Sequence, residues 1–301
     1  MFSLIFEEIF ENCRPFIIND FNGIKGQTND SSGGKINFCL STYKKIFDET
    51  IKKLDKIKYN GSLFLAKEIY FDSNITFQTE EVIKKSTQIV KDKAKIINST
   101  NDFIYSNEIK LTKSLEHREN EDKNTRIVLI PISEISALYY GVDSFSVVLV
   151  YQARDQNGNH ENNIYTTKLI SIYNPIQQSI YTFDLQKGCR FNGVKIVKNN
   201  ITVNKKIASI FVNNYTSSEK QLSFNITKLA QISNYFTTSN DIFSSICLLA
   251  STNINLCFCK IPDTYKELID FMIKCAYLSI KQLNNGYIAI GTEKDLNQFI
   301  K

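Results

Sequence analysis

The sequence predicts a layered protein of the α+β or α/β class. From residue 195 onward, strand-like runs alternate with helix-like runs, as in a sheet that is covered by helices. Before that point, three strand-like runs follow one another closely, at residues 127–130, 144–151 and 167–173. The length of 301 residues and the hydrophobic content of 43% are sufficient for two domains or for one large layered domain.

The first part of the chain is expected to be helical. Apolar residues recur at helical spacing from position 4 to position 13, and we expect this helix to end at Pro15. Residues 22–35 are rich in Gly, Asn and Ser and predict a loop. A second helix is expected to begin at Ser41 or Thr42, because apolar residues recur at helical spacing after that point.

The elements that follow are short. We expect a strand at residues 62–65, a basic helix at 80–97 and a polar loop at 114–124. A further strand is expected at 179–183, with turns at Gly188 and at Asn192-Gly193. Beyond these turns we expect helices at residues 222–232, 242–251 and 265–277, and strands at residues 207–212, 256–260, 278–280 and 287–290.

This pattern predicts two domains. Residues 1–194 are expected to form an N-terminal α+β domain, which contains a long insertion at about 73–124. Residues 195–301 are expected to form a C-terminal α/β domain.

Composition and charge exclude several classes of function. The net charge of +5 comes from scattered lysines, so nucleic acid binding is not indicated. Seven cysteines without metal-ligand spacing predict reduced, buried thiols in a cytoplasmic protein. The N-terminus carries Glu7 and Glu8 and no basic residues, which indicates a helix rather than a signal peptide. No apolar run approaches the ~20 residues that are needed to span a membrane.

Four motifs occur in a distinctive order along the middle of the chain. The sequence reads Val-Leu-Ile-Pro-Ile-Ser-Glu-Ile at 128–135, then Gly-Val-Asp-Ser-Phe at 141–145. Ile-Tyr-Asn-Pro follows at 172–175, and Gly-Cys-Arg-Phe-Asn-Gly at 188–193. This order resembles the inositol monophosphatase family, in which Asp-Pro-Ile-Asp-Gly-Thr precedes a similar strand, an Asn-Pro turn and an Asn-Gly turn. The resemblance implies a layered αβαβα sandwich and a homodimer.

The resemblance also implies a metal site, and this sequence departs from it. In the family, carboxylates hold magnesium ions, which polarise the phosphate and generate the attacking hydroxide. The family's ligand positions fall here on Lys67, Ile130, Ser133 and Thr264. The side chain of Ile130 offers no oxygen atom. Lys67 would place a cation beside the metal, a repulsion of about 4 kcal/mol per unit charge at ~4 Å and an effective dielectric constant of about 20.

The substrate side of the family's site is altered as well. The Gly-Thr backbone that holds the phosphate is replaced by Glu134 and Ile135. A carboxylate at this helix N-terminus would compete with a phosphate. A glutamate that contacts the substrate in many members falls on Cys259, and the family's Gly-Ser/Thr stretch falls on residues 238–241.

The sequence therefore predicts a pseudoenzyme with no catalytic residues and no cofactor. We expect it to act by binding a protein partner or a ligand, with the insertion at 73–124 as the partner surface. The alternative is an active magnesium-dependent phosphatase for a small substrate, such as an inositol phosphate or a nucleotide bisphosphate. Its shifted metal site would consist of Glu68, Glu134 and Asp263. Against this alternative, a shift of one residue along a strand turns a side chain to the opposite face.

Overall fold

The structure is a computed structural model that divides by internal contacts into two compact units, Met1–Ile180 and Tyr181–Lys301. We describe each unit by itself. The sequence analysis placed the domain boundary after residue 194, whereas this division falls within one strand, Ser179–Asp184. The structure describes residues 2–27, 32–59, 61–66, 103–106, 124–154, 165–197, 207–211, 235–239, 241–251, 253–259, 261, 265–283 and 287–299.

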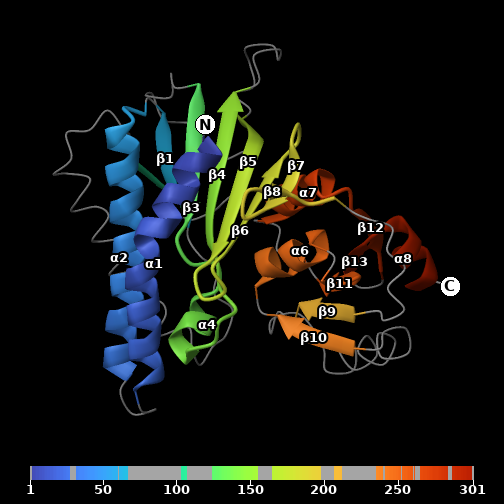
Figure 1. Ribbon diagram of the computed structural model, residues 1–301, viewed down its shortest axis with the longest axis horizontal. Helices are drawn as coiled ribbons and strands as arrows, with labels where there is room; N and C mark the ends of the chain where they lie inside the picture. The colour runs from blue at the N-terminus through green and yellow to red at the C-terminus, as the bar shows by residue number, and fades with distance from the viewer. Residues whose placement is uncertain are drawn as a thin grey trace. The chain divides into compact units, whose positions relative to one another are not determined.

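Two long helices, α1 (Phe2–Lys25) and α2 (Ser32–Lys56), lie side by side in unit 1 (Figure 1). The predicted end of the first helix at Pro15 is wrong, because α1 continues through this proline. A proline in a helix interior costs about 3 kcal/mol. Beyond it, Ile17, Phe21 and Ile24 are buried against the core. Burying each of these side chains contributes roughly 1.5–3 kcal/mol, which together outweighs the cost of the proline.

The predicted loop at 22–35 and the predicted start of the second helix are also wrong in part. α1 extends to Lys25 and α2 already begins at Ser32. Glycine weakens a helix by about 1 kcal/mol, but Gly23 serves close packing here. A Cβ atom at Gly23 would lie 2.5 Å from Cζ of Phe38 on α2, so a larger residue would force the ring to shift.

The sheet of unit 1 contains the strands that the sequence predicted before residue 174. Its order is β2-β1-β3-β4-β5; β1 pairs in parallel with β2 and β3, and β3, β4 and β5 are antiparallel. β2 lies within the predicted insertion, whose other residues up to 123 lie outside the described residues, as does the predicted helix at 80–97. The bounds are β1 Ser62–Ala66, β2 Phe103–Ser106, β3 Thr125–Ile130, β4 Val147–Arg154 and β5 Tyr165–Asn174.

The core of unit 1 lies between α1, α2 and one face of this sheet. Phe10 of α1 stacks on Tyr173 of β5, with ring centroids 5.1 Å apart and planes at 17°. Phe47 of α2 and Leu149 of β4 belong to the same buried cluster. Because side chains alternate along a strand, Ile127 and Leu129 of β3 face the helices, and the residues between them face the other way.

Unit 2 begins with an antiparallel meander in which β6 (Ser179–Asp184) pairs with β7 (Gly188–Phe191), and β7 pairs with β8 (Val194–Lys195). The predicted turn at Asn192-Gly193 is confirmed. Both residues have positive φ, 46° and 78°, which a two-residue hairpin turn of this hand requires and which Asn and Gly tolerate best.

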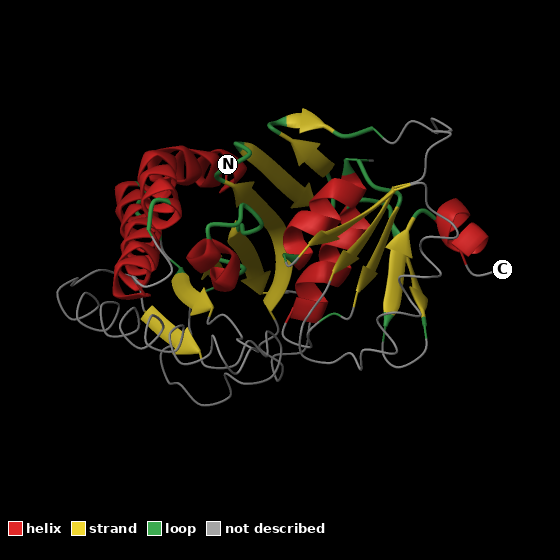
Figure 2. Cartoon of the chain, turned by 90° about the horizontal axis from the view of Figure 1, so that it is seen from below, coloured by secondary structure: helices red, strands yellow, loops and turns green. Residues whose placement is uncertain are grey.

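The second sheet of unit 2 has the order β10-β9-β11-β13-β12. Its three parallel strands are β10, β9 and β11, and β13 and β12 continue it in antiparallel fashion. Helix α6 contacts β9, β10 and β11, helix α8 contacts β12 and β13, and Figure 2 shows α8 on the other side of these strands from α6 and α7. The bounds are β9 Ile207–Phe211, β10 Tyr235–Ser239, α6 Ile242–Ala250, β11 Leu256–Cys259, α7 Lys266–Cys275, β12 Ser279–Gln282, β13 Ile288–Gly291 and α8 Glu293–Phe299.

The predicted α+β class is confirmed. Unit 1 has one helical layer on a sheet, and unit 2 has helices on both sides of its second sheet. The predicted helix at 222–232 lies outside the described residues, and α8 was not predicted. Within the described ranges, no helix has both the length and the apolar character to cross a bilayer.

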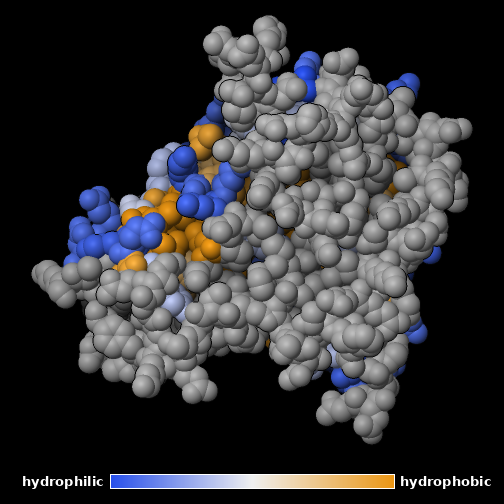
Figure 3. All heavy atoms as spheres, turned by 180° about the vertical axis from the view of Figure 1, so that it is seen from behind, coloured by the Kyte–Doolittle hydropathy of each residue, from blue (hydrophilic) through white to orange (hydrophobic). Residues whose placement is uncertain are grey.

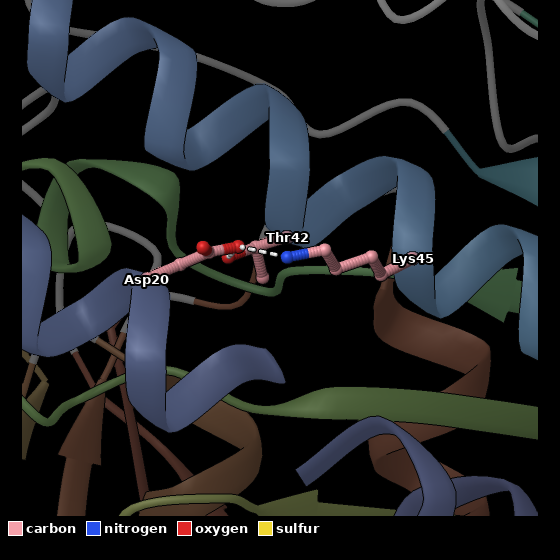
Figure 4. A network of polar contacts seen from close by, with 3 residues as sticks. All are labelled: Asp20, Thr42 and Lys45. Atoms are coloured by element: carbon pink, nitrogen blue, oxygen red, sulfur yellow. Dashed lines mark hydrogen bonds and ion pairs between the residues drawn. The ribbon is translucent and has the colours of Figure 1, made fainter. Parts of the chain in front are cut away.

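A buried carboxylate joins α1 to α2 (Figure 4). Asp20 of α1 is only 3% exposed, and its Oδ2 accepts a hydrogen bond of 3.1 Å from the hydroxyl of Thr42. Nζ of Lys45 lies 3.5 Å from the same oxygen. A buried charge is tolerated only when it is paired and hydrogen-bonded, so these two α2 residues determine where Asp20 can sit.

We expect Thr42→Val to lower the free energy of unfolding by roughly 1–3 kcal/mol, because the buried carboxylate loses a donor while the side-chain volume is nearly kept. Urea denaturation measures the loss. Thr50→Val is the matched control: this buried hydroxyl donates to the carbonyl of Ile46 in its own helix, 2.8 Å away, and its removal should cost less. Equal losses in the two variants would contradict a stabilising role for the Asp20 contact.

All seven cysteines are buried and free. Burial, with a smaller contribution from Glu49, raises the pKa of the Cys13 thiol from 9.0 to about 12. Burial also raises the pKa of Cys275 to about 12. These thiols are therefore held in the neutral form in the folded protein.

Because the folded pKa of Cys13 lies above the ordinary value, its contribution to stability is complete below pH 9.0 and is lost as the pH rises toward 12. We expect the free energy of unfolding to fall as the pH is raised above 9, and Cys13→Ala to reduce this slope. Urea denaturation at a series of pH values tests this. A slope that is identical in the variant would show that Cys13 does not contribute.

Candidate functional site

The end of β3 carries the first of the predicted site residues. Ile130 is fully buried and pairs with Val148 of β4. Its neighbour Leu129 belongs to the core under α1 and α2, so alternation places the Ile130 side chain on the opposite face of the sheet. The position that corresponds to a ligand aspartate is thus a hydrocarbon side chain packed in a sheet.

Ser133 is held in a reciprocal pair with Ser146. The backbone N–H of Ser133 donates to the carbonyl of Ser146 at 2.8 Å. The backbone N–H of Ser146 donates in turn to Oγ of Ser133, also at 2.8 Å. Both residues are buried. The pair ties the segment after β3 to the residue before β4, and the Ser133 hydroxyl satisfies a buried amide.

Glu134 is the N-terminal cap residue of a short helix, α4 (Ile135–Tyr140). Its backbone is extended, with φ −145° and ψ 90°, and its side chain accepts no hydrogen bond from the first amides of the helix. The helix ends at Gly141, whose φ of 69° is the left-handed conformation that favours glycine at this position. Glu134 therefore lies at the helix N-terminus that, according to the resemblance, would hold the phosphate.

The Asn-Pro motif, Asn174-Pro175, also connects two segments of this region by hydrogen bonds. Oδ1 of Asn174 accepts hydrogen bonds from the backbone N–H groups of Ile176 and Gln177, at 3.1 and 2.9 Å. Its Nδ2 donates to the carbonyl of Asp143 at 3.2 Å. Asn174 therefore ties the turn after β5 to the segment after α4. Sequence reasoning did not assign this role, although an Asn directly before a Pro is a known turn signal.

The predicted substrate-side positions of unit 2 have structural roles. Cys259 is fully buried in β11, and burial together with a hydrogen bond to Cys257 raises the pKa of its thiol. Asp241, at the end of the 238–241 stretch, caps α6. Its carboxylate accepts hydrogen bonds from the N–H groups of Phe243 and Ser244, at 3.1 and 3.3 Å. Neither side chain is presented to solvent.

The described residues do not fit a magnesium ion. Magnesium requires several oxygen ligands in near-octahedral geometry. At the end of β3, Glu134 offers a carboxylate. Among the residues that the structure describes, no group of three His, Cys, Asp or Glu side chains could hold a metal. The other predicted positions lie outside the described residues: Lys67, Glu68, Asp263 and Thr264.

Comparison of sequences finds neither a matching family model nor a matching curated protein. Comparison of structures does find relatives. The extragenic suppressor protein suhB from Bartonella henselae is similar over 99% of this chain and 98% of its own, at 11% identity and a TM-score of 0.59. Inositol monophosphatase II from Staphylococcus aureus MSSA476 is similar over 99% of this chain and 93% of its own, at 9% identity and a TM-score of 0.56.

A third solved structure, an IMPase/NADP phosphatase complexed with NADP and Ca²⁺, covers 86% of this chain and 80% of its own, with 12% identity and a TM-score of 0.51. The chain therefore has the fold of the inositol monophosphatase and suhB structures. The resemblance and the fold type predicted from the motifs are confirmed at this level. At these identities the likeness is one of fold, and what the chain does must be argued from its own residues.

We expect Ser133→Ala to lower the free energy of unfolding by roughly 1–3 kcal/mol, because the buried N–H of Ser146 loses its acceptor. Ser171→Ala is the matched control. The Ser171 hydroxyl is equally buried but has no hydrogen-bond partner among the described residues, so its removal should cost little. Thermal or urea denaturation compares the two. A loss in Ser133→Ala no larger than in Ser171→Ala would contradict the role of the serine pair.

Proposed function

We propose that this chain is a non-catalytic protein with the inositol monophosphatase fold, which acts by binding a protein partner or a ligand. The observation that carries the proposal is Ile130. It is fully buried in β3, beside Val148, at the position where the resemblance implies a metal-ligating aspartate. A hydrocarbon side chain cannot coordinate a cation, so the Ile130 side chain cannot replace the carboxylate.

Ser133 and Lys67 support the same proposal. The Ser133 hydroxyl accepts the Ser146 N–H, so it already has a structural task in the segment that would surround a metal. Lys67, known here from the sequence alone, would add a positive charge at a second ligand position. The three changed ligand positions are of three kinds, an apolar side chain, a hydroxyl and a cation, and such a set is more consistent with loss of the reaction than a single substitution would be.

We also propose a partner-binding surface, an oligomeric state and a cellular compartment for this protein. The insertion at 73–124 is the proposed partner surface, and its strand β2 stands at the edge of the sheet of unit 1. A homodimer is proposed from the resemblance. A reducing compartment such as the cytoplasm is proposed from the seven free cysteines.

The second candidate is a magnesium-dependent phosphatase that uses Glu68, Glu134 and Asp263 and acts on an inositol phosphate or a nucleotide bisphosphate. One observation favours it: similar structures are named as an inositol monophosphatase and an IMPase/NADP phosphatase. The first proposal is preferred because the alternative requires carboxylates at three positions that are each one residue away from the family's ligands.

The deciding experiment is calorimetry with Mg²⁺ and Mn²⁺, combined with phosphatase assays on inositol monophosphate and adenosine 3′,5′-bisphosphate. We expect no saturable metal binding and no phosphate release, because the described end of β3 lacks the oxygen ligands that these ions require.

Glu134→Gln is the control variant, since it removes one carboxylate charge and keeps nearly the same shape. Metal binding and turnover that are both lost in Glu134→Gln would establish the second candidate and overturn the first. Turnover that survives Glu134→Gln unchanged would also reject the non-catalytic proposal, and would place the active residues elsewhere in the chain.

A further inference from the structure

β8 is the last strand of its sheet among the residues that the structure describes, so within those residues one side of its backbone has no neighbouring strand. It pairs with β7 in the register Phe191–Val194 and Arg190–Lys195, and the N–H of Ile196 donates to the carbonyl of Cys189 at 2.9 Å. In an antiparallel pair, alternate residues direct their peptide groups toward the partner strand. Because Val194 and Ile196 are directed toward β7, the peptide groups of Lys195 and Val197 are directed outward.

The side chains around this edge are unusually apolar for a protein surface. Val194 and Val197 are 71% and 68% exposed, and Leu185, Phe191 and Tyr277 are exposed as well. An exposed apolar edge strand is a template for pairing with another chain, and proteins commonly protect such edges. Apolar and charged surfaces also lie next to each other among the described atoms of the face seen in Figure 3.

Basic side chains surround the same edge. Lys195 and Tyr277 lie over Gly188: a Cβ atom there would be 3.8 Å from Cε of Lys195 and 4.0 Å from Cε2 of Tyr277. Lys187 is exposed in the preceding turn, and Lys274 is exposed in the last turn of α7, just before Tyr277.

The nearest acidic residue in this meander already has a structural task. The carboxylate of Asp184 accepts hydrogen bonds from the backbone N–H groups of Gln186 and Lys187, at 2.8 and 3.0 Å. These hydrogen bonds leave the charge of Asp184 in place, but the three lysines Lys187, Lys195 and Lys274 outnumber it, so the net charge of these residues is positive. A second copy of the chain paired along β8 would bring its own Lys195 close to the first, which like-charge repulsion disfavours. An acidic segment would be attracted.

We propose that the outer edge of β8 binds an extended acidic segment of a partner protein as an additional strand. The peptide groups of Lys195 and Val197 supply the backbone hydrogen bonds. Because side chains alternate along a strand, apolar residues of the segment cover Val194 on one face, and its carboxylates pair with Lys195 on the other. This inference rests on the proposed binding function and names its partner class and its surface.

The probe is a fluorescein-labelled peptide of alternating Glu and Val, compared by fluorescence anisotropy with a peptide of alternating Lys and Val. We expect the acidic peptide to bind the full chain at least about tenfold more tightly than the basic one. Lys195→Glu should weaken it by about tenfold or more, since attraction becomes repulsion. Val197→Pro should weaken it through loss of the outward N–H. Lys44→Glu, an exposed change of equal charge on α2, is the matched control.

Equal affinity for the two peptides, or equal effects of Lys195→Glu and Lys44→Glu, would overturn the proposal, because binding would then reflect net charge alone. Sedimentation tests the competing occupant: a dimer that Lys195→Glu or Val197→Pro converts to monomers would assign the edge to a second copy of the chain. The outcome is independent of the metal and phosphatase assays. If the acidic peptide does not bind β8, the proposed non-catalytic function is not affected. Phosphatase turnover would reject the non-catalytic function whether or not the peptide binds.

Discussion

β3 lies between β1 and β4, and all of its residues after the first are buried. One face of the strand packs into the core under α1 and α2, and the other face carries Val128 and Ile130, which are also buried. A strand that is buried on both faces must be apolar there or pair its polar groups, as Arg126 does by donating from Nε to Oε1 of Gln152 at 2.6 Å. This constraint determines the composition of unit 1, since the neighbouring strands and the two helices must provide matching apolar surfaces.

The burial of β3 on both faces also affects the candidate site at its end. In the reaction that the resemblance implies, the end of this strand would supply a charged ligand, and a cation would repay the cost of burying it. Here the strand ends in Ile130, and the segment beyond it is held by protein contacts: Ser133 with Ser146, and Asn174 with the carbonyl of Asp143. Hydrogen bonds between protein groups thus stabilise this end of the fold.

Under the proposed non-catalytic function, the chain would act through its surface. The two proposed surfaces are edges of sheets, β2 in unit 1 and β8 in unit 2. Edge strands offer backbone donors and acceptors whatever their side chains are, so they serve recognition without any catalytic residue. Side chains such as Lys195 then select the charge of the segment that binds.

The sequence by itself determined the class of fold, most strands from β1 to β13, and the motif order whose resemblance is confirmed at the level of the fold. These features depend on local alternation and on turn residues such as Asn192 and Gly193, which neighbouring positions along the chain can specify. It also identified Ile130, Ser133 and Glu134 as positions where the chemistry changes. What only the tertiary structure decided depends on contacts between distant segments. α1 continues through Pro15 because core residues lie beyond it, and Gly23 leaves room for Phe38. β2, which lies within the insertion, pairs with β1, and Ser133 pairs with Ser146. Local sequence propensity disfavours or does not specify these features. The packing free energy between distant segments outweighs that propensity.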